Sequence, residues 1–456
     1  MLIKKINTNL SSFELYFLFK DEAYSFFLDS GMDHDKLGQY SFIGFNPFLI
    51  FKSKNDKITI LEKDVVSVFK GSPFDKLKEI LASYKMDYNT EFPFIGGAVG
   101  YLGYDLCHHI EKLSRTAIDD VNIPDCYFGL YDGVIIIDHR KNQVFIASLG
   151  IKDKPEIVIA NIENKIYLGE KKGVKIDISK RFKTSKITSN FTKEQYIDAI
   201  KKIREYIESG DIYQANMTQR FQCTTEENPF DIYSKLREIN PAPFASFMDF
   251  GEGCIVSSSP ERFIKIKNRY IETRPIKGTC PRGKNYKEDL KNKRELLASE
   301  KDKAELLMIV DLERNDIGKI AKAGTVKVTE LFHLETYSTV HHLVSTIIGE
   351  IDDNYDTIDC IKETFPGGSI TGAPKIRSME IIDELEPTQR NIYTGSIGYI
   401  GFNGDVDLNI AIRTIVCKDS KAYFQVGGGI TWNSNANLEY EETLHKAKAL
   451  IEVFKN

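Results

Sequence analysis

The chain has 456 residues, 42% of them hydrophobic and 28% charged, and a formal net charge of −5. This balance lacks a basic footprint, and no apolar run approaches the roughly 20 residues that cross a bilayer, so neither nucleic acid nor membrane is expected as a partner. The seven cysteines are scattered without a C-x-x-C pair, and the first residues do not have a signal-peptide pattern. Both observations favour reduced thiols and a cytoplasmic location.

The first part of the chain, residues 1–175, alternates short β-like runs with turns. The segment "GVIIIDHRKNQVFIASLG" (133–150) predicts a hairpin, and the glycine-dense "PFIGGAVGYLGYD" (93–105) indicates close backbone packing. Residues 176–191 are polar and aperiodic, which predicts a linker. Residues 192–456 then form a second part.

Helical periodicity is clearest after the linker. A capping box begins at Thr192, apolar residues recur on one helical face, and Gly210 marks the end of this helix. Further helices are predicted over 287–316 and 436–454. Because hairpin signals dominate elsewhere, the expected fold class is α+β, with large, mainly antiparallel sheets flanked by helices.

Several motifs follow one another in a recognisable order. They are "GDIYQANMTQR" (210–220), "SSPERF" (258–263), "RPIKGTCPRG" (274–283), "AELLMIVDLERND" (304–316), "HHLVSTI" (341–347), "FPGGSITGAPKIRSMEII" (365–382), "YTGSIGY" (393–399) and "VGGGITWNSNANLEYEETLHKAKAL" (426–450). Over essentially the whole chain, this series resembles the chorismate-utilising enzymes, which include component I of anthranilate synthase and of aminodeoxychorismate synthase. The resemblance implies an anthranilate-synthase-like α/β sandwich of two interlocked subdomains, with the chorismate-binding catalytic domain in residues 192–456.

Four acidic residues are candidates for a metal site. Asp302 and Glu305 stand three apart in one predicted helix, and Glu439 and Glu442 three apart in another, so each pair shares a helical face. On spacing alone, a solvated pair of Glu442 with Lys446 is the simpler interpretation. The resemblance implies instead that Glu305 and Glu442 hold Mg²⁺ with help from Asp302 and Glu439. Asp302 is shorter than the glutamate of relatives, which favours a contact through water.

A second set of residues is implied to bind chorismate, whose two carboxylates need counterions. Consecutive glycines allow the main chain to cradle an anion, although "VGGG" is also compatible with a simple turn or bulge. The implied set is Gly278, Thr279, Ser369, Thr371, Tyr393, Arg413, Gly427, Gly429 and Lys446.

The group that attacks the substrate ring distinguishes members of the family. Where isochorismate and salicylate synthases have a water-activating lysine, this chain has Gln214, whose amide is no base at neutral pH. Lys277 occupies a position that is alanine in anthranilate synthases and lysine in aminodeoxychorismate synthases. From its neighbours alone, Lys277 would be a solvated loop lysine. A lysine with a pKa of ~10.4 is neutral only about once in a thousand molecules near pH 7.4, so a nucleophilic role requires desolvation or a nearby cation.

Two further residues match catalytic positions. Glu261 matches the general acid that protonates the departing C4 hydroxyl, a role that requires a raised pKa; a turn glutamate paired with Arg262 is the simpler alternative. His342 matches a residue close to the ring, although histidines in such positions are often structural. Cys280 stands where relatives have arginine, which puts the anchoring of that loop in doubt.

The chain lacks the cysteine and histidine of a glutamine amidotransferase, so a separate subunit is expected to supply ammonia from glutamine. The amino-terminal part resembles elements that bind tryptophan in relatives, and ordinary core packing explains the same residues equally well. The candidates for tryptophan binding are Ser30, Ser41, Pro243 and Phe244.

Taken with Lys277, the resemblance predicts Mg²⁺-dependent amination of chorismate to 4-amino-4-deoxychorismate through a lysine adduct, for 4-aminobenzoate and folate synthesis. The alternative is the reaction of anthranilate synthase, which yields anthranilate and pyruvate. A scaffold without activity would not need Glu261, Lys277, Glu305 and Glu442 together.

Overall fold

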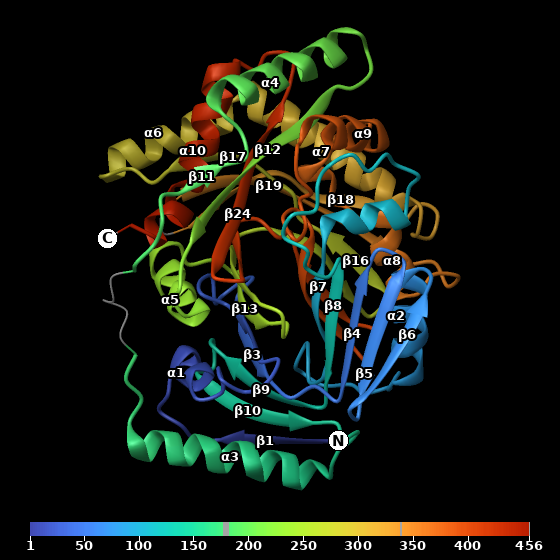
Figure 1. Cartoon of the computed structure of the whole chain (residues 1–456), viewed down its shortest axis with the longest axis vertical. Coiled ribbons are helices and arrows are strands. Elements are labelled where there is room, and N and C mark those ends of the chain that lie inside the picture. The colour runs from blue at the N-terminus through green and yellow to red at the C-terminus, as the bar shows by residue number, and fades with distance from the viewer. Residues whose placement is uncertain (177–181, 338–339, 456) are drawn as a thin grey trace.

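The computed structural model describes residues 1–176, 182–337 and 340–455. Within this part, the strands form two twelve-stranded sheets in which the named strand pairs are antiparallel. Helices flank the sheets (Figure 1), as expected for the α+β class. None of the described helices combines the length and apolar character needed to cross a lipid bilayer.

The first sheet mixes strands from both ends of the chain. Its spatial order is β1 (Leu2–Ile6), β10 (Gln143–Ser148), β9 (Gly133–Asp138), β3 (Tyr40–Gly44), β2 (Phe26–Asp29), β13 (Phe244–Asp249), β14 (Cys254–Ser259), β23 (Thr414–Lys418), β24 (Lys421–Ile430), β12 (Gln214–Thr224) and β11 (Thr188–Ser189), with β20 (Gly372–Ala373) also on β12.

The second sheet is mixed in the same way. Its order is β17 (Ile276–Pro281), β19 (Val340–Glu350), β16 (Tyr270–Thr273), β15 (Arg262–Lys267), β22 (Val406–Asn409), β21 (Ser396–Gly401), β7 (Gly97–Leu102), β8 (Cys126–Tyr131), β4 (Leu49–Lys54), β5 (Lys57–Glu62) and β6 (Val65–Lys70), with β18 (Lys327–Thr336) on β19. Each sheet therefore joins a block of strands from before the predicted linker to a block from after it, at β2 and β13 in the first sheet and at β21 and β7 in the second. Of that linker, residues 177–181 lie outside the described residues, and Thr188–Ser189 form strand β11.

The helices of the first half are short or peripheral. They are α1 (Ser12–Phe17), α2 (Pro73–Ser83), the 3₁₀ helix η1 (Tyr104–His109) and α3 (Pro155–Lys172). Helix α3 buries Ile159, Ile162 and Ile166 in the same apolar cluster as residues of β1 and β10, at the lower end of the molecule (Figure 1).

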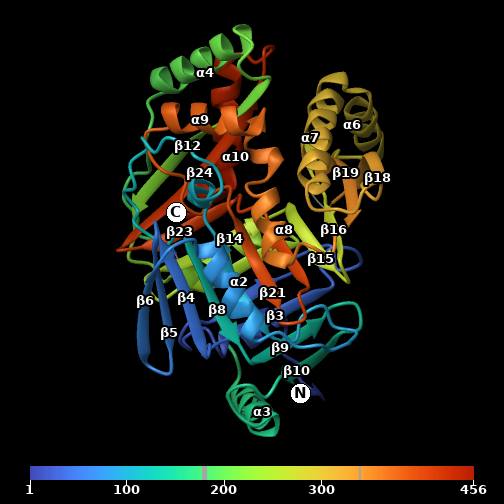
Figure 2. The ribbon, with the colours of Figure 1, turned by 90° about the vertical axis from the view of Figure 1, so that its right-hand side faces the viewer.

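The second half contributes most of the helical mass. Its helices are α4 (Lys193–Glu208), α5 (Pro229–Ile239), α6 (Tyr286–Ala298), α7 (Glu300–Gly318), α8 (Thr357–Thr364), the 3₁₀ helix η2 (Gly368–Ile370), α9 (Lys375–Leu385) and α10 (Ala436–Val453). Seen from the side, α6 and α7 stand with β18 and β19 in a lobe of their own (Figure 2).

Local predictions are confirmed at several elements. The hairpin of β9 and β10 turns after Asp138, and Thr192 and Gln195 form the capping box of α4. At Gly100 in β7, a Cβ atom would lie 1.8 Å from the Tyr127 carbonyl oxygen, so the backbones do pack closely there.

The single helix predicted over 287–316 is wrong, because the structure has α6 and α7 with a break at Ser299. Ser299 adopts an extended conformation, and its side chain accepts a hydrogen bond from the Asp302 backbone N–H as the N-cap of α7. The cap fixes where α7 begins and directs its first turns toward the site.

Candidate functional site

One cavity of about 670 Å³ collects the residues predicted for catalysis, substrate binding and metal binding. Strand β17, helices α7 and α10, strand β24 and the η2 turn all contribute to its lining. The predicted residues that line it are Glu261, Lys277, Gly278, Thr279, Asp302, Glu305, His342, Ser369, Tyr393, Arg413, Gly427, Gly429, Glu439, Glu442 and Lys446. Thr371 is buried beside it and is not part of the lining.

A β-bulge aims Lys277 into this cavity. Lys277 pairs with Leu343 of β19, whereas Thr279 pairs with His342, so the register shifts at Gly278. Gly278 has φ +74°, and a Cβ atom there would lie 2.9 Å from Cβ of Asp302 on α7. Glycine is thus needed for both the bulge and the close approach of α7. The bulge breaks the strand's alternation, and consecutive residues 276–279 line the cavity.

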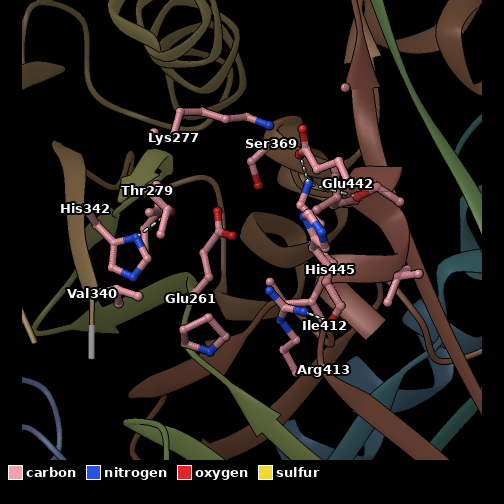
Figure 3. A pocket seen from close by; sticks show the side chains of 18 of the residues that line it. Glu261, Lys277, Thr279, Val340, His342, Ser369, Ile412, Arg413, Glu442 and His445 are labelled. Atoms are coloured by element: carbon pink, nitrogen blue, oxygen red, sulfur yellow. Dashed lines mark hydrogen bonds and ion pairs between the residues drawn. The ribbon is translucent and has the colours of Figure 1, made fainter. Parts of the chain in front are cut away.

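The environment of Lys277 favours the neutral amine. Burial lowers the pKa of Lys277 and the positive charge of Lys446 lowers it further, while Glu305, Glu261 and Glu442 oppose the change. Its side chain extends above Glu261 toward the Glu442 side of the cavity (Figure 3). The ammonium group therefore lies near the acidic residues and not in bulk solvent.

The pKa of Glu261 is raised, whereas that of Lys277 is lowered. Glu261 is 7% exposed in the turn between β14 and β15, and burial raises its pKa against the effects of the Ser369 hydroxyl and the Lys277 charge. The turn is fixed because the Ile410 backbone N–H donates to the Glu261 carbonyl oxygen over 2.9 Å. Arg262 instead pairs with Asp407 and Glu272, so no surface pair neutralises Glu261. The raised pKa favours the protonated form of this carboxyl group in the cavity.

His342 is held as a neutral imidazole. Burial lowers its pKa to about 4, with a further contribution from the Arg413 charge. Its Nδ1 atom lies 2.7 Å from Oγ1 of Thr279 on the paired strand. This bond orients the ring at the wall opposite Arg413 (Figure 3), where a neutral imidazole can donate or accept one hydrogen bond.

Two glycines of strand β24 form part of the cavity wall. A Cβ atom on Gly427 would lie 2.4 Å from the Met217 carbonyl oxygen, and one on Gly429 would lie 2.6 Å from the Gln214 amide nitrogen, so neither position has room for a side chain. Arg413 faces the same region with a positive φ of 54°, a strained conformation for a residue with a side chain. Its guanidinium donates to the carbonyl oxygen of Lys446, which ties it to α10.

The four acidic candidates lie on two helices that face each other. On α10, Oε2 of Glu439 and Oε1 of Glu442 lie 3.4 and 3.8 Å from the point where a Cβ atom of Gly428 would stand. On α7, burial and the charges of Asp302 and Glu439 raise the pKa of Glu305, although Lys277 and Lys301 oppose this shift. Carboxylates from both helices therefore share one electrostatic environment.

This donor set fits Mg²⁺, which takes few protein carboxylates and completes its shell with water or substrate oxygens. Among the described residues, no three acidic, histidine or cysteine side chains form a ready-made metal site. Each acid also has a partner of its own. Asp302 accepts from Ser299 over 2.5 Å, Glu439 from Ser434 over 2.7 Å, and Glu442 pairs with Lys446 over 2.7 Å. Asp302 is therefore directed back to its own helix cap and is the least available of the four.

The loop that contains Cys280 is anchored by other contacts. The Cys280 thiol points at the Asn292 carbonyl oxygen of α6, 3.5 Å away. Two positions later, Arg282 donates to Asp289 over 2.7 Å and to the Tyr337 carbonyl oxygen over 2.9 Å. Arg282 thus joins α6, β17 and β18, the task expected of the arginine that this chain lacks at Cys280.

Other residues that line the cavity were not predicted. Gln425 could have been found, because it precedes Gly427 and Gly429 by steps of two on β24 and side chains alternate along a strand. Asn216 follows Gln214 by the same step, yet Gln214 itself is buried behind Gly429 and does not line the cavity. His445 precedes Lys446 on α10 and also faces the cavity (Figure 3).

A second cavity, of about 260 Å³, contains most of the residues considered for tryptophan. Ser30, Pro243 and Phe244 line it, and Pro243 lines the first cavity as well. Ser41 does not line this cavity, and its buried hydroxyl accepts from the Ser30 N–H and lies 2.7 Å from His139. Binding of tryptophan in this cavity stays a prediction.

Comparison with known proteins identifies the family of the chain. A model of the family described as "chorismate binding enzyme" matches residues 23–452. The chain belongs to this family. Anthranilate synthase component 1 of Acetivibrio thermocellus is 40% identical over 455 residues, covering 97% of this chain and 92% of the relative. Aminodeoxychorismate synthase component 1 of Bacillus subtilis (strain 168) is 38% identical over 417 residues, covering 91% and 88%.

A solved structure agrees with the fold. Anthranilate synthase component I from Streptococcus pneumoniae TIGR4 superposes with a TM-score of 0.80 at 33% identity and covers 90% of this chain and 91% of its own. As a chorismate-binding enzyme, the chain thus has the expected sandwich of large antiparallel sheets. Relatives with two different reactions match at similar identity, so the residues of the cavity must distinguish between them.

Proposed function

We propose that this chain is the aminating component of aminodeoxychorismate synthase and converts chorismate and ammonia to 4-amino-4-deoxychorismate and water. The observation that supports this proposal is the lysine amine of Lys277 inside the cavity with a lowered pKa, beside Glu261 with a raised pKa. Opposite shifts of two neighbouring groups are typical of a nucleophile and an acid that work together.

In the first step, the neutral amine of Lys277 attacks C2 of the ring. Both ring double bonds shift, from C1=C2 to C1=C6 and from C5=C6 to C4=C5, the C4–O bond breaks, and Glu261 gives its proton to the departing hydroxyl, which leaves as water. Lys277 is then bound to C2 as a secondary ammonium, and Glu261 is a carboxylate.

In the second step, ammonia attacks C4 and the bond between C2 and Lys277 breaks with return of the electron pair to nitrogen. The new C4 ammonium gives one proton to Glu261, which restores both residues. His342 lines the same cavity as a neutral group and is suited to orienting the ring without adding charge.

Glu305 and Glu442 would hold Mg²⁺, with Glu439 in support, and the ion would neutralise and orient the ring carboxylate of chorismate. The second carboxylate would lie against Arg413, Tyr393 and the backbone N–H groups of the β24 glycines. Ammonia would come from a separate glutamine amidotransferase subunit, since the relatives carry the name "component 1".

The second candidate function is that of anthranilate synthase, because a relative with that name is 40% identical. In that reaction ammonia attacks C2, which is the atom that Lys277 would occupy. The two functions therefore predict different products from the same cavity.

Incubation of the purified chain with chorismate, Mg²⁺ and ammonium, followed by identification of the product by mass and fluorescence, tests the proposal. Aminodeoxychorismate, convertible to 4-aminobenzoate by a lyase, is the expected product, whereas accumulation of anthranilate would reject the proposal.

Lys277→Ala should slow turnover at least about 100-fold. The control Lys303→Ala, on α7 and outside the cavity lining, should not.

A further inference from the structure

A buried carboxyl group that the proposed reaction does not use lies behind Glu261. Glu313 on α7 is 8% exposed. It packs beneath the η2 turn, because a Cβ atom on Gly368 would lie 3.3 Å from Cγ of Glu313. Gly368 directly precedes Ser369, which lines the cavity.

The hydrogen bonds around Glu313 require an additional proton. The hydroxyl of Thr273 lies 2.9 Å from Oε2 of Glu313 and 2.8 Å from the carbonyl oxygen of Phe263. A hydroxyl has one proton and can form a linear hydrogen bond with only one of two acceptors at a time. If Glu313 were ionised, one of these short contacts would set two oxygen lone pairs against each other. If Glu313 is protonated, it donates to Thr273, Thr273 donates to Phe263, and both contacts are hydrogen bonds.

Among the residues that the structure describes, no cation pairs with Glu313 in place of this proton. Lys375 is the positively charged group near Glu313, and its ammonium already donates to Asp316, to the Thr364 carbonyl oxygen over 3.1 Å and to the Pro366 carbonyl oxygen over 2.8 Å. An ammonium group has three N–H donors, so none remains for Glu313. In the described parts of the chain, Thr273 is the one side chain that forms a hydrogen bond with the Glu313 carboxyl group.

The electrostatic surroundings act in the same direction. Burial raises the pKa of Glu313 to about 8, and the charges of Glu261 and Asp316 raise it, whereas the Thr273 hydrogen bond and the Lys375 charge lower it. These groups face Glu313 from the turn before β15, from α7 itself, from β16 and from α9.

The hydrogen-bond chain joins the backbone segments that carry the two reactive groups. Phe263 stands two residues after Glu261 on β15, and Thr273 stands four residues before Lys277 at the end of β16. The backbone pairing of β15 with β16 ends at Lys265 and Glu272. Beyond that pair, the Thr273 side chain continues the connection between the strands.

We propose that Glu313 is a neutral carboxylic acid that donates to Thr273, and that this chain of hydrogen bonds positions Glu261 relative to Lys277. The positioning of Glu261 relative to Lys277 rests on the proposed function, whereas the protonation of Glu313 does not. Glu313 itself does not line the cavity, so the hydrogen bonds through Thr273 and Phe263 are the connection by which it positions Glu261.

Infrared difference spectra of the full chain, wild type minus Glu313→Gln, test the protonation. At about pH 6, well below the raised pKa, the difference should contain the C=O stretch of a protonated carboxylic acid. Carboxylate stretches should replace that band as the pH rises through about 8. Carboxylate bands alone at about pH 6 would overturn the proposal. This measurement is independent of the reaction catalysed.

Turnover of matched variants tests the positioning. Glu313→Gln keeps a donor toward Thr273 and should keep kcat within about threefold of wild type, whereas Glu313→Leu should lower kcat roughly 10–100-fold with little change in KM for chorismate. Thr273→Val should behave like Glu313→Leu, and Thr273→Ser like wild type. Equal kcat values for Thr273→Val and Thr273→Ser would overturn positioning even if Glu313→Leu fails to fold. If no chorismate turnover occurs at all, the proposed function fails while the infrared result stands.

Discussion

Lys446 lowers the pKa of Lys277 through its positive charge, and among the causes only burial has a larger effect. Both side chains line the same cavity, and Lys446 is fixed there by Glu442 over 2.7 Å and by the Gly427 carbonyl oxygen over 3.0 Å. The charge of Lys446 thus favours the neutral form of the Lys277 amine, the form that the proposed reaction uses.

Lys446→Met should therefore raise the pKa of Lys277 and reduce the fraction of neutral amine at neutral pH. The rate at which an amine-reactive reagent modifies Lys277, followed by mass spectrometry, should fall roughly tenfold for each unit that the pKa rises. Lys446→Arg keeps the charge and serves as the control. An unchanged pH profile of modification in Lys446→Met would show that Lys446 has no such influence.

Glu261 should impose a decline in turnover toward alkaline pH. Its folded-state pKa is raised by burial, and the protonated form is the acid that the reaction needs, so activity is present below that pKa and is lost as pH rises through it. Glu261→Gln should lower kcat on the order of 10²–10⁴-fold and remove this limb. Ser369→Ala removes a group that lowers the pKa of Glu261 and should move the limb to higher pH. A limb that persists in Glu261→Gln would assign it to another group.

Removal of Mg²⁺ by a chelator should stop turnover reversibly. Glu442→Gln should raise the Mg²⁺ concentration for half-maximal activity by roughly 10–100-fold. Glu441→Gln provides the matched control, because Glu441 pairs with Lys193 over 2.8 Å and does not line the cavity. Calorimetric titration with Mg²⁺ in the presence of chorismate checks binding apart from activity. Equal Mg²⁺ requirements for the two variants would remove Glu442 from the metal site.

A buried ion pair behind Tyr393 should dominate local stability. Arg390 donates to Glu386 over 2.7 and 2.9 Å, and both side chains are almost fully buried. Arg390→Met leaves the Glu386 carboxylate buried without its cation and should cost about 3–5 kcal/mol, measured as a shift in the denaturant midpoint. Arg377→Met breaks partly exposed pairs with Glu380 and Asp211 and should cost less than about 1 kcal/mol. Similar shifts for the two variants would contradict this account.

Local features of the fold were predictable because their signals are local. The capping box at Thr192 and the hairpin after Asp138 depend on neighbouring residues alone. The break at Ser299 was missed because charged residues on both sides continue the helical composition, although serine with an acid three residues later is an N-cap pattern. The order of strands in the two sheets depends on pairings between distant segments, which no local pattern specifies.

In the candidate site, too, some features could be predicted from the sequence and others could not. Motifs identified the residues that now line the cavity, such as Lys277 and Glu442. Sequence could not indicate that Gln214 lies behind Gly429, or that Ser41 uses its hydroxyl within the protein. Those outcomes depend on which neighbour each side chain meets after folding. The sequence could not single out Glu313 for the same reason, because its proposed role depends on the Thr273 hydroxyl and the Phe263 carbonyl oxygen, which lie on other strands.

The joining of strands from both halves of the chain in each sheet also affects how the molecule folds. Leu28 of β2 pairs with Ser246 of β13, and Tyr101 of β7 pairs with Ile397 of β21, so neither sheet can be completed by one half of the chain. Pairings between such distant segments make folding slow, since large loops must close before the contacts form. A fragment ending before the linker would expose unpaired strand edges and aggregate, whereas co-expressed halves should recover an intact enzyme by mutual complementation.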